Sequence, residues 1–257
     1  MNKMLNRLTW DTIGKMDRDN TYFVLPISSM EQHGKHLPVG TDDIILERVL
    51  ENICEGKSVF ESIYFLPTIH YGNSCEHCGF PGTISLRADT VVAMIEDVLS
   101  GMKQHAFKNL IILNSHGGNS DLLRAFAQEW KLAYSINVYT INIWASGFFN
   151  DAAGMIKTPL EYEIHAGEIE TSILMHTDGD CVKREMILRG LDVYATLNDY
   201  DCGWTSKELS PGNGIIGAAS KADAETGEKI LEYMRRKILF YFSQIIQGNR
   251  PDKWQTL

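Results

Sequence analysis

Four short apolar runs alternate along the chain with longer stretches in which apolar residues recur every three or four positions. Short runs rich in Val, Ile, Tyr and Phe predict buried β-strands, and the wider spacing predicts amphipathic helices. Thr41 can cap the first long helix and Gly56 can end it. We therefore expect strands at 21–28, 62–72, 109–113 and 136–144, and helices at 41–56, 88–106, 120–134, 170–177 and 223–247.

This alternation of strands and helices is typical of an α/β fold with a mostly parallel sheet that helices cover on both faces. The chain shows no internal repeat and no change of composition that would indicate a linker. The least regular segments are 145–165 and 189–222, and we expect them to shape a pocket. In open sheets of this kind, ligands bind at the carboxyl ends of the strands.

Polar clusters fall where that rule predicts a site. EQHGKH follows the strand at 21–28, NSCEHCGF follows the strand at 62–72, and NSHGGN follows the strand at 109–113. Trp144 ends the last strand, and HAGEIET comes soon after it. Because the carboxyl ends of parallel strands share one edge of a sheet, we expect these clusters to converge on one crevice.

Composition narrows the classes of function. The chain has 257 residues, of which 44% are hydrophobic and 22% charged, so it can bury a core without a structural metal. Its net charge of −9 and the absence of a basic stripe argue against a nucleic-acid partner. No apolar run is long enough to span a membrane, and the start does not read as a secretory signal, so we expect a cytoplasmic protein.

The cysteines suggest neither a disulfide framework nor a zinc ribbon. There are five of them, an odd number, and they are scattered along the chain. Cys75 and Cys78 form one CxxC pair, but no second pair at similar spacing completes a zinc site.

The segment after the first strand carries metal-capable side chains. Glu31 and His33 are two residues apart, so they project to the same side of an extended chain. Asp42 follows at the start of a helix. Each residue alone reads as an ordinary polar side chain. Together, two carboxylates and an imidazole suit Zn²⁺ or Mn²⁺, and a bridging carboxylate could hold two ions that activate a water.

Two later clusters could complete such a site. NSHGGN places His116 directly after an apolar strand, beside two glycines that allow close backbone approach. In HAGEIETS, His165 and Glu168 are three residues apart and face the same way on a helical turn. Glu170 is expected to face elsewhere, as an acid favoured at the start of a helix.

These motifs together resemble the creatininase (creatinine amidohydrolase) family. The resemblance rests on EQHGKHLPVGTD, FPGTISL, NSHGGN, HAGEIETS and GIIGAASKADAETGEK, in that order, and runs from about Tyr22 to Gln247. It implies a three-layer α/β/α fold with a largely parallel sheet, formed by residues 1–257 as a single creatininase-like metallohydrolase domain. It also implies two divalent ions, zinc or manganese, hydrolysis of C–N bonds in amides or cyclic amides, and a homo-oligomer, commonly a hexamer.

The resemblance also assigns metal ligands. Glu31, His33, Asp42 and His116 match ligands of the family, with Asp42 bridging the two ions. Creatininase carries a further Glu two residues after the histidine that matches His116, whereas this chain has Gly118 there. We expect Glu168 to replace that ligand, because creatininase has no acid at the Glu168 position.

Other matches concern catalysis and substrate. His165 matches the catalytic histidine of creatininase, expected to stabilise the oxyanion or protonate the leaving nitrogen, and Glu168 could carry a proton from water. Trp144 matches a substrate-pocket tryptophan. His77 is expected to contact substrate, with a purely structural histidine as the alternative. Creatininase has Glu and Trp where this chain has Ile164 and Glu161, which argues against creatinine as the substrate.

The sequence therefore predicts a metal-dependent hydrolase acting on an amide, formamide or cyclic amide of a small molecule. A second possibility is hydrolysis of a cyclic ketone such as an oxidised inositol, which breaks a C–C bond. A different class is a nucleotide or sugar-phosphate binding module that uses NSHGGN to hold an anion. A member of the family kept only for assembly is a further alternative, against which the nearly complete ligand set argues.

Overall fold

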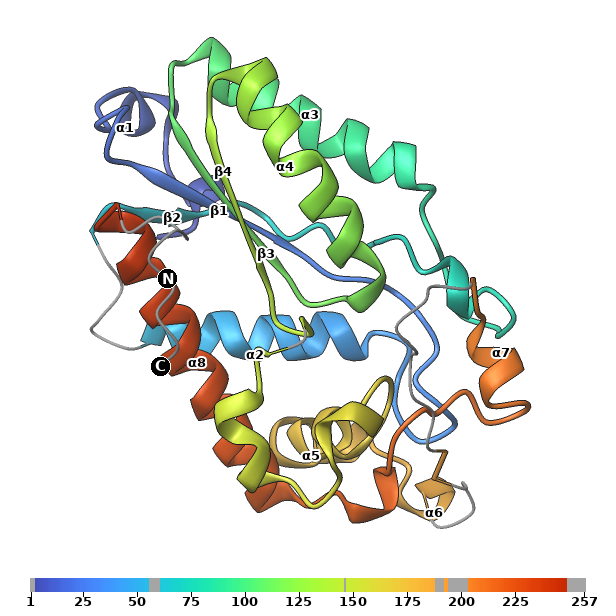
Figure 1. Ribbon diagram of the computed structural model, residues 1–257. Helices are drawn as coiled ribbons and strands as arrows, with labels where there is room; N and C mark the ends of the chain where they lie inside the picture. The colour runs from blue at the N-terminus through green and yellow to red at the C-terminus, as the bar shows by residue number, and fades with distance from the viewer. Residues whose placement is uncertain (1–2, 56–60, 146, 188–191, 194–202, 249–257) are drawn as a thin grey trace.

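The computed structural model describes residues 3–55, 61–145, 147–187, 192–193 and 203–248 (Figure 1). The strands are β1 (Tyr22–Ile27), β2 (Ile63–Phe65), β3 (Asn109–Asn114) and β4 (Asn137–Asn142). The helices are α1 (Trp10–Gly14), α2 (Thr41–Glu55), α3 (Ala88–Gln104), α4 (Ser120–Tyr134), α5 (Glu168–Thr177), α6 (Arg184–Ile187), α7 (Ser206–Leu209) and α8 (Ala224–Ile246).

The four strands form one parallel sheet in the order β2-β1-β3-β4. Tyr22 of β1 is in register with Ile63 of β2 on one side and with Asn109 of β3 on the other. The chain leaves β1 toward β2 and then crosses back to β3, so the strand order reverses at β1. At such a reversal the connections diverge, and a crevice opens between the carboxyl ends of β1 and β3.

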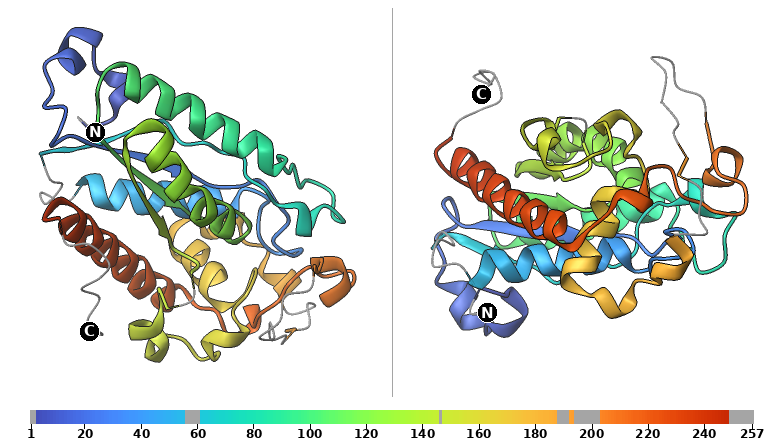
Figure 2. Two further views of the ribbon diagram at one scale, coloured as in Figure 1. Left: turned by 45° about the horizontal axis from the view of Figure 1, so that its top comes forward. Right: turned by 90° about the horizontal axis from the view of Figure 1, so that it is seen from below.

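Helices cover both faces of the sheet, which confirms the predicted three-layer α/β/α class (Figures 1 and 2). Alternate side chains of a strand point to opposite faces. Phe23 and Leu25 therefore pack in the cluster with α3 and α4, whereas Tyr22 and Val24 pack in the cluster with α2, α5 and α8. All residues of β1 and β3 are buried, as expected for parallel strands with both faces covered.

The helices α5 and α8 pack unusually closely, and Gly227 makes this possible. A Cβ at Gly227 would lie 1.9 Å from the carbonyl oxygen of Ser172 on α5. Asp223 caps the start of α8, where its Oδ1 accepts a hydrogen bond from Thr226 N at 2.8 Å. The close approach at Gly227 holds α5 against α8, and α5 carries residues of the site.

Most predicted boundaries agree with the structure to within a few residues, with two exceptions. The strand expected at 62–72 spans only Ile63–Phe65, because Pro67 has no N–H to continue the ladder and only an isolated bridge joins Ile27 to Ile69 beyond it. The helix expected from position 170 begins two residues earlier, at Glu168. The second difference changes which acid faces the site.

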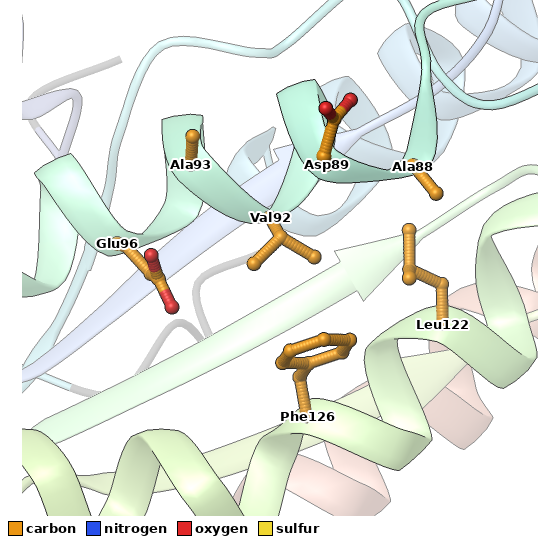
Figure 3. A pocket seen from close by; sticks show the side chains of 7 residues that line it. All are labelled: Ala88, Asp89, Val92, Ala93, Glu96, Leu122 and Phe126. Carbon is orange, nitrogen blue, oxygen red and sulfur yellow. The ribbon is translucent and has the colours of Figure 1, made fainter.

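A pocket of about 390 Å³ lies between α3 and α4 (Figure 3). Val92, Leu122 and Phe126 face one another across it, and Asp89 and Glu96 add two acids. Its lining holds no histidine or cysteine and shares no residue with the polar clusters described below. Among the described residues, no helix is long and apolar enough to cross a membrane.

Candidate metal centre

The loop after β1 returns the chain to its starting point, so that Asp42 lies beside Glu31. Glu31 N donates to Val39 O at 2.9 Å, and the Thr41 side chain donates to Pro38 O at 2.7 Å. The Ser29 hydroxyl donates to the carboxylates, 2.8 Å from Glu31 Oε2 and 2.9 Å from Asp42 Oδ2. Both carboxylates are almost fully buried.

A first ligand group consists of Glu31, Asp42 and His116. His116 Nδ1 lies 3.1 Å from Glu31 Oε2 and 3.2 Å from Asp42 Oδ2. The other ring nitrogen, Nε2, donates to the carbonyl oxygen of Asn73 at 2.8 Å. That hydrogen bond assigns the proton to Nε2, so the lone pair of Nδ1 faces the two carboxylates, as in a metal-binding histidine.

A second group consists of His33, Asp42 and Glu170. His33 Nε2 lies 3.6 Å from Asp42 Oδ1 and 3.6 Å from Glu170 Oε1, while Nδ1 donates to Glu31 O at 3.1 Å. His33 Nε2 is buried and, within the described part of the chain, has no hydrogen-bond partner. A buried nitrogen left unpaired is costly, and a cation at this point would satisfy it.

The two groups share Asp42, which turns one oxygen toward each. Two imidazoles and three carboxylates are donors that suit Zn²⁺ or Mn²⁺. The residues therefore fit a pair of divalent ions joined by a bridging carboxylate, the arrangement that the resemblance implied for Asp42.

The prediction that Glu168 supplies the fifth ligand is wrong. Its buried carboxylate accepts hydrogen bonds from Lys157 N and Thr158 N, both at 2.8 Å, and from Thr158 Oγ1 at 2.6 Å. Because α5 already begins at Glu168, residues 168 and 170 lie about 200° apart around the helix, and only one can face the centre. Glu170 faces it, so neither the ligand role nor the proton-carrying role expected of Glu168 fits its position.

The charges of the two groups depend on each other. Burial alone would lower the pKa of both imidazoles, but the charges of Glu170 and Asp42 raise that of His33 well above 6.5, and those of Glu31 and Asp42 do the same for His116. Burial opposes ionisation of Asp42, yet the adjacent imidazoles of His116 and His33 hold its pKa well below the usual range. This cluster stabilises bound positive charge, whether protons or metal ions.

His165 and His77 stack beside Glu31, with ring centroids 4.1 Å apart. His165 Nε2 donates to Gln32 O at 2.7 Å, which leaves the lone pair of Nδ1 facing Glu31 Oε1 at 3.7 Å. His77 Nε2 lies 3.4 Å from the same Glu31 oxygen. Burial and the neighbouring imidazoles lower the pKa of His77 to about 2 and that of His165 well below 6.5, so both rings are neutral.

Gln32, which the sequence reasoning missed, fixes the tautomer of His77. Gly34 N donates to Gln32 Oε1 at 2.9 Å, and this sets the orientation of the amide. The two hydrogens of Nε2 then go to Gly214 O at 3.0 Å and to His77 Nδ1 at 3.1 Å. His77 consequently carries its proton on Nε2, the nitrogen that faces the site. No sequence pattern distinguishes this glutamine from any polar loop residue.

Two late segments line the site, as expected for the irregular parts of the chain. The Trp144 indole N–H donates to Ser115 O at 2.5 Å, next to His116, and its ring lies 5.7 Å from that of Phe149. Ser206 Oγ lies 3.0 Å from His77 Nδ1. Residues 189–191 and 194–202 of the segment 189–222 lie outside the described residues. Contacts of Trp144 and His77 with substrate stay predictions.

Comparison with known proteins agrees with the motifs. The sequence profile of the family described as "Creatininase: Creatinine amidohydrolase" matches residues 6–240. The mycofactocin precursor peptide peptidase of Mycolicibacterium smegmatis is 29% identical over 239 residues, covering 90% of this chain and 85% of that protein. The 3-dehydro-scyllo-inosose hydrolase of Thermotoga maritima is 24% identical over 257 residues, covering 89% and 80%.

A solved structure described as "Creatininase Mn" superposes with a TM-score of 0.72 and 23% identity. The match covers 95% of this chain and 98% of that one. At this identity the likeness shows the fold.

Proposed function

Since the chain belongs to the creatininase family, whose members are hydrolases, we propose that it is a divalent-metal-dependent hydrolase of a small molecule with an amide, formamide or cyclic amide bond. One observation carries the proposal. Glu31, Asp42 and His116 form one ligand group, His33, Asp42 and Glu170 form another, and the two share Asp42. No structural role requires three buried carboxylates to converge in this way.

Two divalent ions in these groups would lower the pKa of a water, so that it gives up a proton near neutral pH, and would polarise the carbonyl group of the substrate. The remaining chemistry belongs to side chains. His165 Nδ1 has a free lone pair beside Glu31 Oε1, so His165 takes a proton from the attacking water and gives it to the leaving nitrogen. His77 presents an N–H from Nε2, and this group donates to the developing oxyanion.

The surroundings of His165 hold it for this role. The residue is joined to Ile216 by an isolated antiparallel bridge, and Ala218 N donates to Glu163 Oε1 at 3.1 Å. Glu163 Oε2 also accepts from Ile169 N at 3.0 Å at the start of α5. Burial raises the pKa of Glu163 to about 7. These contacts tie the late segment to the helix that carries Glu170.

The relatives indicate the chemical class of the substrate. The peptidase and inosose hydrolase among the relatives indicate amide or peptide substrates first, and a cyclic ketone as the second candidate. Creatinine is disfavoured, because Ile164 and Glu161 stand where creatininase has Glu and Trp. A cytoplasmic location and a homo-oligomer, a hexamer by family resemblance, stay predictions.

A phosphate-binding module is the weaker reading of the same residues. His116, which would open the anion-binding turn of NSHGGN, instead faces the carboxylates of Glu31 and Asp42. A phosphate placed there would meet two buried negative charges without a cation to offset them.

Metal analysis of the purified protein tests the proposal. We expect two Mn²⁺ or Zn²⁺ ions per chain, and fewer than about one ion per chain would contradict it. Asp42→Asn should abolish binding of both ions, because it removes a charge that both groups share. Asp43→Asn is the matched control: Asp43 pairs with Ser28 and His70 and belongs to a separate, more exposed group with Glu47 and His70, so its replacement leaves both buried groups intact.

The loaded protein should then be assayed on N-formyl amines, short peptides, lactams and cyclic ketones. Hydrolysis of an amide or formamide that Asp42→Asn abolishes and Asp43→Asn retains is the expected result. Turnover of cyclic ketones alone would favour the second candidate, and no turnover of any substrate by metal-loaded protein would favour a role in assembly.

A further inference from the structure

Position 118 has no room for the acid that creatininase carries there. A Cβ built on Gly118 would lie 2.5 Å from the carbonyl oxygen of Asn73, from Glu76 Oε1 and from His116 Nε2. Two of these three atoms belong to the loop that follows β2. That loop therefore fills the space beside His116 that a side chain at 118 would otherwise occupy, and it brings a carboxylate with it.

This carboxylate belongs to Glu76, on the short helix η2 (Cys75–His77). Glu76 Oε1 lies 3.7 Å from His116 Nε2 and 3.8 Å from His77 Nε2, beyond hydrogen-bond distance of both rings. The backbone around it is fixed, because Ser206 Oγ donates to Glu76 O at 3.2 Å and His77 N donates to Ser74 O at 3.0 Å. The side chain is 16% exposed.

The position of Glu76 differs from that of every other acid at the centre. The carboxylates of Glu31, Asp42 and Glu170 all face the ligand groups, whereas Glu76 lies on the outer side of His116. His77 Nε2 connects the two regions, since it is 3.4 Å from Glu31 Oε1 and 3.8 Å from Glu76 Oε1. Glu76 therefore lies next to the His77 nitrogen that we expect to donate to the substrate's oxyanion, on the side of that nitrogen away from Glu31.

We propose that Glu76 accepts a hydrogen bond from the N–H of the scissile amide and so selects amides that carry an N–H over esters and ketones. The inference rests on the proposed function. A carboxylate accepts hydrogen bonds only, so it favours a donor beside the carbonyl and repels an ester oxygen or a second carboxylate at the same place. Glu76, which belongs to the loop after β2, thereby occupies the space that an acidic side chain at position 118 would fill.

Binding of two small probes to the Mn²⁺-loaded protein tests this role. Acetohydroxamic acid offers a carbonyl with an adjacent N–H, whereas acetate offers a charged oxygen instead. Glu76→Met keeps the length of the side chain and removes the acceptor. Isothermal titration should show that this variant binds acetohydroxamic acid about 10- to 100-fold more weakly and acetate more tightly than the wild type does. Glu76→Gln keeps one acceptor oxygen, so its affinity for each probe should lie between the affinities of the wild type and of Glu76→Met.

Hydrolysis of a matched pair, N-formylbenzylamine and benzyl formate, gives a second readout. In Glu76→Met, kcat/KM should fall about 10- to 100-fold for the formamide and change little for the ester. Cys78→Ser is the matched control, because Cys78 is the exposed cysteine directly after the same short helix and its thiol donates to Ser74 O rather than to Glu76, so this change should leave both probes unaffected. All variants should retain two ions per chain.

The possible failures are distinguishable. Equal weakening of both probes, or no change of either, would overturn the role of Glu76 while metal binding and hydrolysis by the wild type stand. A wild-type protein that binds neither metal nor acetohydroxamic acid would instead overturn the proposed function.

Discussion

The two acids of α5 should respond differently when each is replaced by its amide. Glu170→Gln removes a charged ligand from the group that also contains His33 and Asp42. Glu168→Gln leaves both ligand groups intact but disturbs a buried carboxylate that receives hydrogen bonds from Lys157 and Thr158. One change should therefore affect metal binding and the other should affect stability.

The structure sets the size of both effects. Replacement of a residue that only supports a ligand weakens metal binding by about 10- to 100-fold, so loss of the Glu170 charge should weaken the second ion by at least about 100-fold. For Glu168→Gln, three charge-assisted hydrogen bonds become neutral, and the new amide group faces a donor. We expect a loss of roughly 2–4 kcal/mol, or about 5–15 °C in Tm for a chain of this size.

Metal content after dialysis and thermal melting of the EDTA-treated protein measure the two effects separately. Glu170→Gln should retain one ion per chain after dialysis. After EDTA treatment, its Tm should be close to that of the EDTA-treated wild type. Glu168→Gln should retain two ions and melt at a lower temperature. If Glu168→Gln lost an ion while Glu170→Gln kept both, the assignment of the fifth ligand from the start of α5 would be refuted.

Four further results are expected. EDTA should lower the Tm by about 5–10 °C relative to protein with Mn²⁺ at about 100 times its Kd, as measured by differential scanning fluorimetry. This difference in Tm should widen from about pH 6 to about pH 8.5. In the metal-free protein, the raised pKa values of His33 and His116 stabilise the fold below the ordinary value of 6.5, and this stabilisation is lost as pH rises through the raised values. Metal binding strengthens over the same range, because it needs the deprotonated rings. A constant difference would contradict the ligand assignment. Gly118→Ala should reduce metal content, because its Cβ meets the backbone of the loop and His116, whereas Gly117→Ala, which has open space, should not. Asp223→Ala should cost about 1 kcal/mol in chemical denaturation through the lost cap of α8, and an unchanged midpoint would show that the cap contributes nothing.

Much of the fold could be predicted from periodicity alone. The runs that became β1 and β3 are continuous and apolar because both faces of a parallel sheet are covered, and α3, α4 and α8 follow the three-to-four spacing of buried positions. Pattern reasoning was less exact at element ends. β2 ends early because of Pro67, and α5 starts two residues before the predicted position, so that both Glu168 and Glu170 lie within the helix.

Within the site, Glu31, His33, Asp42 and His116 could be predicted because each follows the carboxyl end of a strand or begins the helix after it. Their positions along the chain thus determine the edge of the sheet at which they lie. The choice of Glu170 over Glu168 could not be predicted, because it depends on a helix start that the backbone of residues 157 and 158 stabilises from elsewhere in the chain.

By itself, the sequence determined the fold class, the edge of the sheet that carries the chemistry, and four of the residues gathered there. Those features depend on local periodicity and on strand polarity, which short stretches of sequence encode. Only the tertiary structure distinguished Glu170 from Glu168 as the acid that faces the candidate ligand groups, and only it showed the hydrogen bonds that place the protons on His77 and His165 and the position of Glu76 beside Gly118. The histidine protons and the position of Glu76 depend on contacts between segments more than forty residues apart in the sequence, and the choice of Glu170 depends on where α5 begins. The spacing of residues within a single motif does not encode such contacts.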